Sequence, residues 1–477
     1  MLGSRVPINR LFPWWGALLL DLTLLAGVMS GAVYVPRQAV TVRWERYAAE
    51  LLATGEPLTF KEIERMRAKI PDERNGALVI EKLRPHLEVI AVAPTDGVLI
   101  FDDNLTVADF FVGIPRHAIE SSRAFVVEHS DILRDLSSLH DKPTGRLSLC
   151  YDRLDGNPLE IRLPSLTPWR NAAKLEHLDV TLRLIDGDSE AAAVAVRLQF
   201  HIAASLNEEP TLMARLVQIA VDRLAVRSLE SILRVGQVQD ETLLDLASDV
   251  KARLLSSSMH AAFTCERASF IILCDQLATG QLSLSSVTGK RRDGVARLPP
   301  EDVREEQIHG VQMYTWLVEA KDDPKAMLAA STRIDKELHK LARNITRKPN
   351  LIGKLIPSFR RAVELHVAAE AELQCALVAL GAERFRLRTG RFPESVARLV
   401  PDYLDEAASD PFDGKRIEYA TIDDGIVVYV IGENEKDDGG SVAPTVQNDH
   451  PKDVGFRLFR AERRGLLVKD YRRPGRE

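Results

Sequence analysis

Cysteine and aromatic residues are scarce in this sequence. Its 477 residues include four cysteines, and aromatic side chains make up 6% of the chain. Four cysteines are too few for a scaffold held together by disulfides, and their spacing matches no zinc-binding pattern. Cys265 and Cys274 fall in one expected helix, residues 260–277, on opposite faces and roughly 13 Å apart, too far for a disulfide. We therefore expect the cysteines to be small buried side chains.

The chain also lacks a large net charge of either sign. The formal net charge is -6, and the hydrophobic and charged fractions, 45% and 28%, are those of an ordinary globular protein. Such a chain has no basic field that would neutralise a phosphate backbone, so nucleic acid is not an expected partner. The length exceeds what one hydrophobic core supports, which predicts two or three folded units.

The local signatures of common enzymes are absent. The sequence contains no Gly-x-Ser-x-Gly elbow, no Gly-x-Gly-x-x-Gly, no phosphate loop and no His-Glu-x-x-His. His366 and Glu370 are spaced to share a helical face, but no third metal ligand is evident, so we expect a surface pair. The same interpretation applies to His129 and His140, which flank a short acidic stretch.

One long hydrophobic run stands near the N-terminus. Residues 14–35 read WWGALLLDLTLLAGVMSGAVYV, long enough to cross a hydrocarbon core of about 30 Å as a helix. Trp14, Trp15 and Tyr34 lie at its ends, where amphipathic rings favour the headgroup layer. Asp21 is the exception, and we interpret it as an acid tolerated near one interface, the alternative being a contact between helices. The run predicts a single transmembrane anchor.

A cleaved signal peptide is the alternative interpretation of this run. Arg5 and Arg10 form a charged start, and residues 30–32 resemble a cleavage site between small residues. The apolar stretch is longer than usual for a signal peptide, which favours an uncleaved anchor. Its orientation is weakly determined, because the arginines on its two sides balance.

Residues 36–163 carry mixed signals. Residues 40–52 have a helical pattern, and Thr59 with Glu62 forms a capping box that opens a short helix through Lys69. Residues 87–101 mix β-branched residues with turn residues and predict a small strand pair. The stretch 147–163 is also predicted to be extended.

The central part of the chain predicts successive antiparallel helices. Residues 166–277 keep apolar residues at helical spacing and are divided by turn residues at 186–188, 207–210 and 236–237. No fixed repeat period recurs, so an irregular helical bundle is favoured over an α-solenoid.

A glycine, serine and basic stretch at 279–303 predicts an exposed loop. Helices are expected to resume from Glu301, and the longest should reach about Arg388. Its predicted buried stripe consists of Leu373, Ala376, Leu377, Leu380 and Leu387.

The C-terminal part has a different pattern. Gly390 and Pro393 end the long helix, and a short helix follows in SVARLVPDYL. After the turn Asp-Pro-Phe-Asp-Gly, two β-rich runs at 416–421 and 425–431 predict a hairpin. A glycine-rich acidic loop follows, and residues 454–460 predict another strand.

This order of motifs resembles the globular head of type II secretion system major pseudopilins. The resemblance covers about residues 369–440, under a fifth of the chain, and rests on several turn and aromatic residues that match in order. It implies that the acidic loop binds calcium through Asp437 and Asp438, with Asn434 as a further ligand. Oxygen ligands on a glycine-rich turn suit this cation, although such a loop is also an ordinary polar turn.

The chain departs from that family at its start. The N-terminus MLGSRVPINRLF lacks the pseudopilin processing site, and over three hundred residues separate the anchor from the head-like helix. Assembly into a fibre is therefore not expected, and a shared fold does not by itself carry function.

The resulting prediction is a mainly α protein with an N-terminal transmembrane helix, an irregular helical bundle or α-solenoid-like body, and a small α+β C-terminal module. We expect a single-pass protein of the bacterial cell membrane with its body on the non-cytoplasmic side. Its predicted role is a scaffold or interaction protein that contacts the membrane and other envelope proteins, and the alternative is a membrane-tethered hydrolase. The predicted units are a tail 1–13, the anchor 14–35, a mixed region 36–163, helical domains 164–278 and 304–388 joined by the loop 279–303, the pseudopilin-like module 389–460 and a basic tail 461–477.

Overall fold

The fold is taken from a computed structural model. The structure describes residues 39–90, 116–153, 164–256, 258–283, 285, 298–343, 351–432, 434–442 and 453–464. The predicted anchor 14–35 and the basic run in the 279–303 loop lie outside these residues, as do most of the basic tail and residues 154–163.

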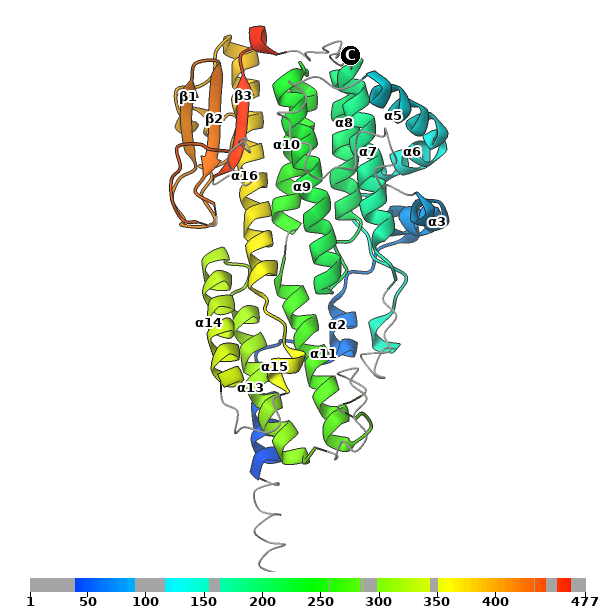
Figure 1. Ribbon diagram of the computed structural model, residues 1–477, viewed down its shortest axis with the longest axis vertical. Coiled ribbons are helices and arrows are strands. Elements are labelled where there is room, and N and C mark those ends of the chain that lie inside the picture. The colour runs from blue at the N-terminus through cyan, green and yellow to red at the C-terminus, as the bar shows by residue number, and fades with distance from the viewer. Residues whose placement is uncertain are drawn as a thin grey trace, which may run out of the picture.

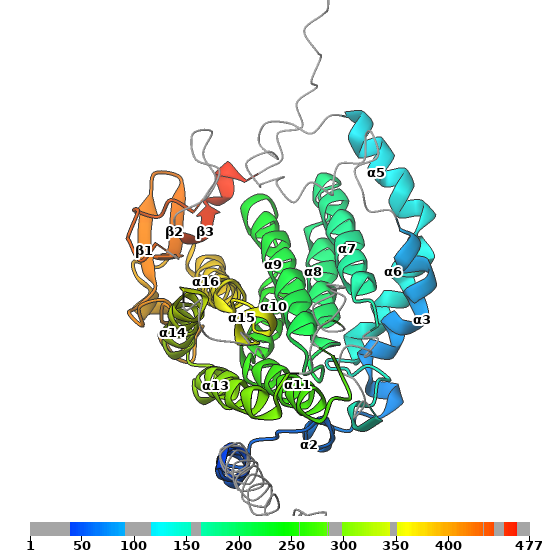
Figure 2. The same ribbon diagram turned by 60° about the horizontal axis from the view of Figure 1, so that its bottom comes forward.

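The described part of the chain is mainly helical, with a three-stranded sheet near the C-terminus (Figure 1). This confirms the predicted fold class for the body. Residues 39–53 form a helix at the end of the body where α11 and α13 lie, whereas the sheet lies at the opposite end (Figures 1 and 2). Val40 and Trp44 of that first helix are buried in the same hydrophobic cluster as α13.

Four helices form the centre of one half of the body. Helices α7 (Thr167–Ile185), α8 (Ser189–Ala204), α9 (Leu212–Val235) and α10 (Asp240–Ser256) follow one another through short turns and pack side by side. The turns lie where the sequence predicted them. Helices α3 (Gly76–Val89), α5 (Arg116–Glu128) and α6 (Ser130–Leu136) cover the outer side of α7.

The other half contains α11 (His260–Thr279), α13 (Pro300–Glu319), α14 (Pro324–Arg343) and α15 (Ile352–Leu355). Helices α11 and α13 cross closely at Gly310, where a Cβ atom would overlap the ring of Phe270. Cys265 and Cys274 are buried and free in α11, as predicted, but Cys150 is partly exposed.

Helix α16 (Arg360–Thr389) is the longest described helix and contacts elements of both halves. It packs against α9, α10, α14 and two strands of the sheet. It is long and apolar enough to cross a membrane, but 72% of its most apolar window is buried inside the fold, which accounts for its composition. The predicted stripe is mostly confirmed, although Leu387 is 41% exposed because it lies in the last turn, beyond the packed part of the helix.

The sheet is antiparallel, with β1 (Glu418–Ile422), β2 (Gly425–Val430) and β3 (Val454–Phe459) in that order. The predicted hairpin is confirmed by the β1–β2 pairing, and the predicted last strand is β3. Strands β2 and β3 pack on α16, and β3 also reaches α9. Leu380 of α16, Val428 of β2 and Leu246 of α10 therefore belong to one hydrophobic cluster.

Several predictions for the irregular parts need correction. The capping box is confirmed, but its helix α2 (Phe60–Met66) ends before Lys69. Residues 87–89 belong to α3 and not to a strand, because Leu87 continues the buried face of this helix, which packs on α7, whereas Val89 is 77% exposed. Residues 91–101 lie outside the described residues. Residues 151–153 and 396–399 form single 3-10 turns where a strand and a short helix were predicted.

Candidate binding groove

The acidic loop that follows β2 is organised by a carboxylate that the sequence did not single out. Asp453, just before β3, is fully buried. It accepts hydrogen bonds from the backbone N–H groups of Asp438, Gly440 and Ser441 at 3.2, 2.9 and 3.0 Å. Loop and strand are thus joined by charge-assisted hydrogen bonds.

The structure brings the three predicted calcium ligands into this loop. Asn434 donates a hydrogen bond to Asp438 at 2.7 Å, so these two side chains are in contact. Asp437 accepts hydrogen bonds from the Tyr429 hydroxyl at 3.1 Å and from the Gly439 backbone at 2.8 Å. Burial and the neighbouring Asp437 raise the pKa of Tyr429 to about 12. Among the described residues, no cluster of three His, Cys, Asp or Glu side chains is arranged to hold a metal.

Calcium binding at this loop remains a prediction of the resemblance. For a dissociation constant of about 0.1–1 mM, addition of about 5 mM calcium should stabilise the protein by about 1–2 kcal/mol. We expect a rise of a few degrees in Tm, measured by thermal shift against sodium chloride at equal ionic strength. Asp438→Asn should remove the rise, and Asp423→Asn, an exposed acid in the β1–β2 turn, should keep it. An unchanged Tm eliminates calcium as a ligand.

His366 and Glu370 do not form the predicted surface pair. His366 is 1% exposed, because α16 is covered on several sides. Its Nδ1 lies 3.3 Å from the Arg215 guanidinium, and its Nε2 lies 4.0 Å from Glu370. Burial and the charge of Arg215 lower the pKa of His366 to about 3. His366 is therefore part of the interior, and Glu370 is half-buried beside it.

The other predicted surface histidines also pack against neighbours. The ring of His129 lies 4.3 Å from that of Phe125, and the ring of His140 lies 5.4 Å from that of His201. Burial is the main cause that lowers the pKa of His140. Neither histidine belongs to a metal-binding cluster within the described parts of the chain.

Replacing His366 with glutamine is expected to improve stability in acid relative to the parent protein. The unfolded chain binds a proton at this imidazole below its ordinary pKa of about 6.5, whereas the folded protein does so only near pH 3, so stability is lost as the pH falls. The difference in unfolding free energy between variant and parent should shift by about 2 kcal/mol in the variant's favour from pH 7 to pH 5.

Glu370 changes the stability of the folded protein with pH in the opposite direction to His366. Burial raises its pKa to about 7, so the folded carboxyl takes up its proton first and gains stability as the pH falls. Both proteins keep Glu370, so the comparison isolates His366. Urea denaturation at pH 7 and pH 5 measures the difference in unfolding free energy between variant and parent. If this difference were the same at both pH values, His366 would not be a buried neutral imidazole.

A pocket of about 210 Å³ lies between α2 and α11 and is called here the α2–α11 pocket. Arg67, Glu209 and His260 are among its lining residues. Glu209 is bonded to Arg67 at 2.5 Å and to the Tyr151 hydroxyl at 3.1 Å, so both of its oxygens are engaged. The Nδ1 atom of His260 lies 3.0 Å from the backbone carbonyl of Val318. These groups join α2 to the rest of the body.

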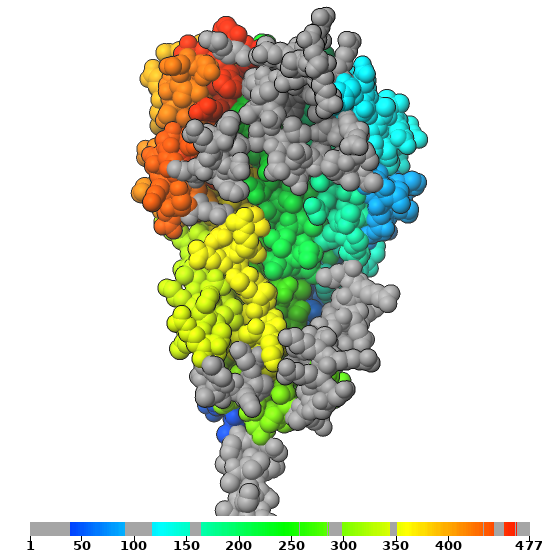
Figure 3. All heavy atoms as spheres, in the orientation of Figure 1, coloured from blue at the N-terminus to red at the C-terminus, as the bar shows by residue number. Residues whose placement is uncertain are grey.

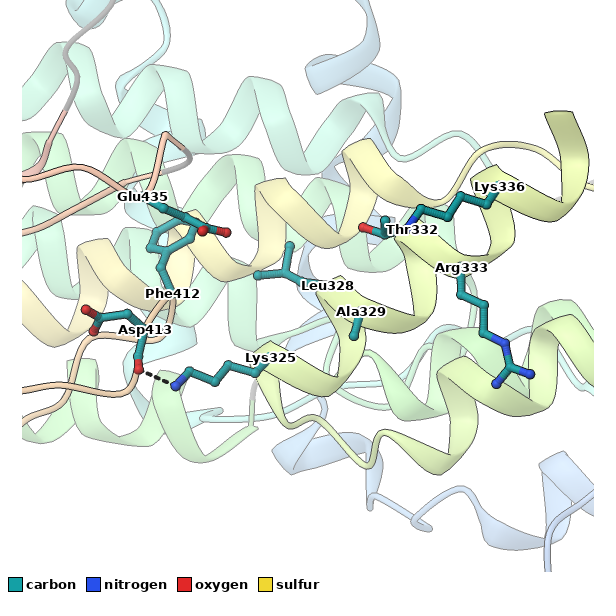
Figure 4. A pocket seen from close by; sticks show the side chains of 9 residues that line it. All are labelled: Lys325, Leu328, Ala329, Thr332, Arg333, Lys336, Phe412, Asp413 and Glu435. Atoms are coloured by element: carbon teal, nitrogen blue, oxygen red, sulfur yellow. Dashed lines mark hydrogen bonds between the residues drawn. The ribbon is translucent and has the colours of Figure 1, made fainter.

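A larger hollow, about 540 Å³, lies between α14 and the C-terminal module, and we call it the α14 groove. Figure 3 shows α14 and the module next to each other on one face of the molecule. Lys325 donates a hydrogen bond to the backbone carbonyl of Asp413, which holds α14 against the turn that precedes β1 (Figure 4). The lining residues are Lys325, Leu328, Ala329, Thr332, Arg333, Lys336, Phe412, Asp413 and Glu435.

The charged side chains of the α14 groove differ in whether they already have partners. Asp413 pairs with Lys415 at 2.7 Å, and Arg333 lies over the ring of Trp316 at 3.6 Å. The side chains of Lys336 and Glu435 are exposed and have no hydrogen bond or ion pair with another described residue. These two are the charges that the groove offers to a partner.

Sequence reasoning made no prediction for the α14 groove. One wall of the groove is visible in the sequence, because residues 325, 328, 329, 332 and 336 have the spacing that places them on one face of α14. The second wall comes from a turn and a loop nearly a hundred residues later, and one sequence does not show that they meet. Comparisons with protein-family models, with curated proteins and with solved structures found no match for this chain.

Proposed function

We propose that this chain is a single-pass, membrane-anchored scaffold or interaction protein of the bacterial envelope, and that it binds its partner in the α14 groove. The groove supports this proposal, since it is a hollow with an apolar floor and with two charged side chains that have no partner among the described residues. Concave sites with a few convergent polar groups are the usual places of binding. In the α2–α11 pocket, Glu209 and His260 already make hydrogen bonds within the protein, which favours a binding protein over an enzyme.

With an anchor at residues 14–35, as we propose, the groove would lie outside the membrane. Residues 39–53 follow the anchor in sequence and lie at one end of the body, and the sheet lies at the other (Figure 1). We propose that the body and the pseudopilin-like module 389–460 extend away from the membrane on the non-cytoplasmic side. The resemblance to secreted-side pseudopilin heads supports this orientation and suggests a role associated with secretion.

A pull-down from detergent extracts tests the proposal. Deleting the C-terminal module would be a poor variant, because β2 and β3 cover α16 and their loss would expose its buried face. Lys336→Glu is preferable, since this side chain is exposed and surface substitutions change stability by about 0.5 kcal/mol or less. We expect specific partners with the parent protein and their loss with this variant. Equal recovery with both would remove the groove as the binding site.

A membrane-tethered hydrolase remains the second candidate function. The observation in its favour is that His260 and Glu209 both line the α2–α11 pocket. Saturable turnover of a model ester that disappears in a folded His260→Ala variant would replace the scaffold proposal.

A further inference from the structure

The two charges of the α14 groove that have no described partner are opposite in sign and lie at its two ends, whereas Lys325 is bonded to the Asp413 carbonyl and Arg333 stacks on Trp316. Lys336 lies on α14 at one end, and Glu435 extends from the loop after β2 at the other (Figure 4). Neither side chain is neutralised by a described neighbour. A groove of this kind favours an occupant that carries a base at one end and an acid at the other. The base would then face Glu435, and the acid would face Lys336.

The floor between these ends is apolar. Leu328 and Ala329 on α14 face Phe412 across the hollow, and Thr332 adds a hydroxyl beside them (Figure 4). Phe412 is 7% exposed, so its ring is a fixed wall and not a mobile surface side chain. The bond of Lys325 to the Asp413 carbonyl holds the two walls together. An apolar side chain in the middle of the occupant would be buried here.

The length of the groove fits a short extended chain. Lys325 contacts the turn at the Glu435 end, and Lys336 comes eleven residues later on the same helix. At 1.5 Å per residue this corresponds to about 16 Å. An extended peptide rises about 3.3 Å per residue, so about five residues cover the distance.

We propose that the α14 groove binds an extended peptide segment of about five residues, with a basic residue at Glu435, an apolar residue over Leu328 and Phe412, and an acidic residue at Lys336. This inference rests on the proposed function and specifies the chemistry of its partner. A peptide that runs in either direction satisfies it, provided that its two ends carry opposite charges.

Four peptides test this specificity: Lys-Ala-Phe-Ala-Glu, Glu-Ala-Phe-Ala-Glu, Lys-Ala-Phe-Ala-Lys and Gln-Ala-Phe-Ala-Gln, all with a neutral fluorophore on the N-terminal amine and an amidated C-terminus. Fluorescence anisotropy with the detergent-solubilised full chain gives each Kd, up to millimolar concentrations. We expect the peptide with mixed charges to bind about tenfold more tightly than the neutral one. The peptides with two like charges should bind more weakly than the mixed peptide.

Two charge reversals should change the preference in a defined way. Lys336→Glu makes both ends acidic, so the peptide with two lysines should become the tightest ligand. Glu435→Lys makes both ends basic, so the peptide with two glutamates should become the tightest. The double variant has opposite charges again and should recover binding of the mixed peptide.

Lys340→Glu is the matched control, since Lys340 is an exposed lysine on the same helix that is not a lining residue of the groove. It should leave all four Kd values unchanged. If Lys340→Glu and Lys336→Glu changed the Kd values equally, the peptides would be attracted by the overall charge, and the groove would be overturned as the binding site. If no peptide binds saturably but partner recovery still depends on Lys336, the peptide inference fails and the proposed function stands. If recovery does not depend on Lys336, both fail.

Discussion

Replacing Asp222 with alanine is expected to lower the free energy of unfolding by about 3–5 kcal/mol. Asp222 on α9 accepts two hydrogen bonds from Arg253 on α10, at 2.8 and 3.0 Å. Both side chains are 2% exposed, so removal of the carboxylate leaves a buried guanidinium without its counter-charge. Urea denaturation of the detergent-solubilised protein measures the loss.

The double variant Asp222→Leu with Arg253→Met separates the charge from the packing. Removing both charges eliminates the desolvated ion pair, so this variant should be clearly more stable than Asp222→Ala. Arg253 also donates to Asn207 at 2.6 Å, which keeps the double variant below the parent protein. A loss with Asp222→Ala of less than about 1 kcal/mol would mean that water reaches Arg253.

Local patterns predicted the elements of this fold well. Gly187, with a φ of 80°, ends the turn between α7 and α8 at the predicted break, and Gly390, also at 80°, caps α16. The hairpin followed from two β-rich runs on either side of the turn at Asp423 and Asp424. These signals are contained in short stretches of sequence, because they arise from backbone geometry and turn chemistry.

Contacts between distant residues were not predictable in the same way. Glu383 on α16 is bonded at 2.6 Å to Arg464, 81 residues later, and each appears in the sequence as an ordinary surface charge. His366 was misassigned for the same reason, since its burial depends on α9, α14 and α16 together. The calcium ligands were placed by a resemblance, but the carboxylate that orders their loop, Asp453, lies beyond its range.

The α14 groove is the clearest case of a site that could not be predicted from the sequence. Its basic wall is visible in the helical spacing of α14, and its acidic end is visible in the acidic loop. What the sequence lacks is the information that Lys325 bonds to the turn at Asp413, 88 residues away. That bond turns two ordinary polar stretches into one site, so the specificity proposed for the groove depends on tertiary structure.

Replacing Trp169 with alanine is the second change with a large expected effect, again about 3–5 kcal/mol. Trp169, near the start of α7, is fully buried and belongs to the cluster that joins α7 to α3 and α8. Its indole N–H donates to the Ser205 hydroxyl at 2.8 Å. The alanine variant loses this bond and leaves a large cavity among Leu, Ile and Ala side chains, which relax only partly around it. Urea denaturation gives the change.

Trp169→Phe distinguishes packing from hydrogen bonding at this position. Phenylalanine keeps an aromatic ring in the cluster but cannot donate to Ser205, whose hydroxyl retains its own bond to the Ile202 carbonyl at 2.7 Å. Because Ser205 is not left without a partner, the cost of losing the indole N–H should be about 1 kcal/mol, and the remainder of the alanine effect should come from the cavity. Equal losses for the phenylalanine and alanine variants would reverse this assignment and make the hydrogen bond the main contribution of Trp169.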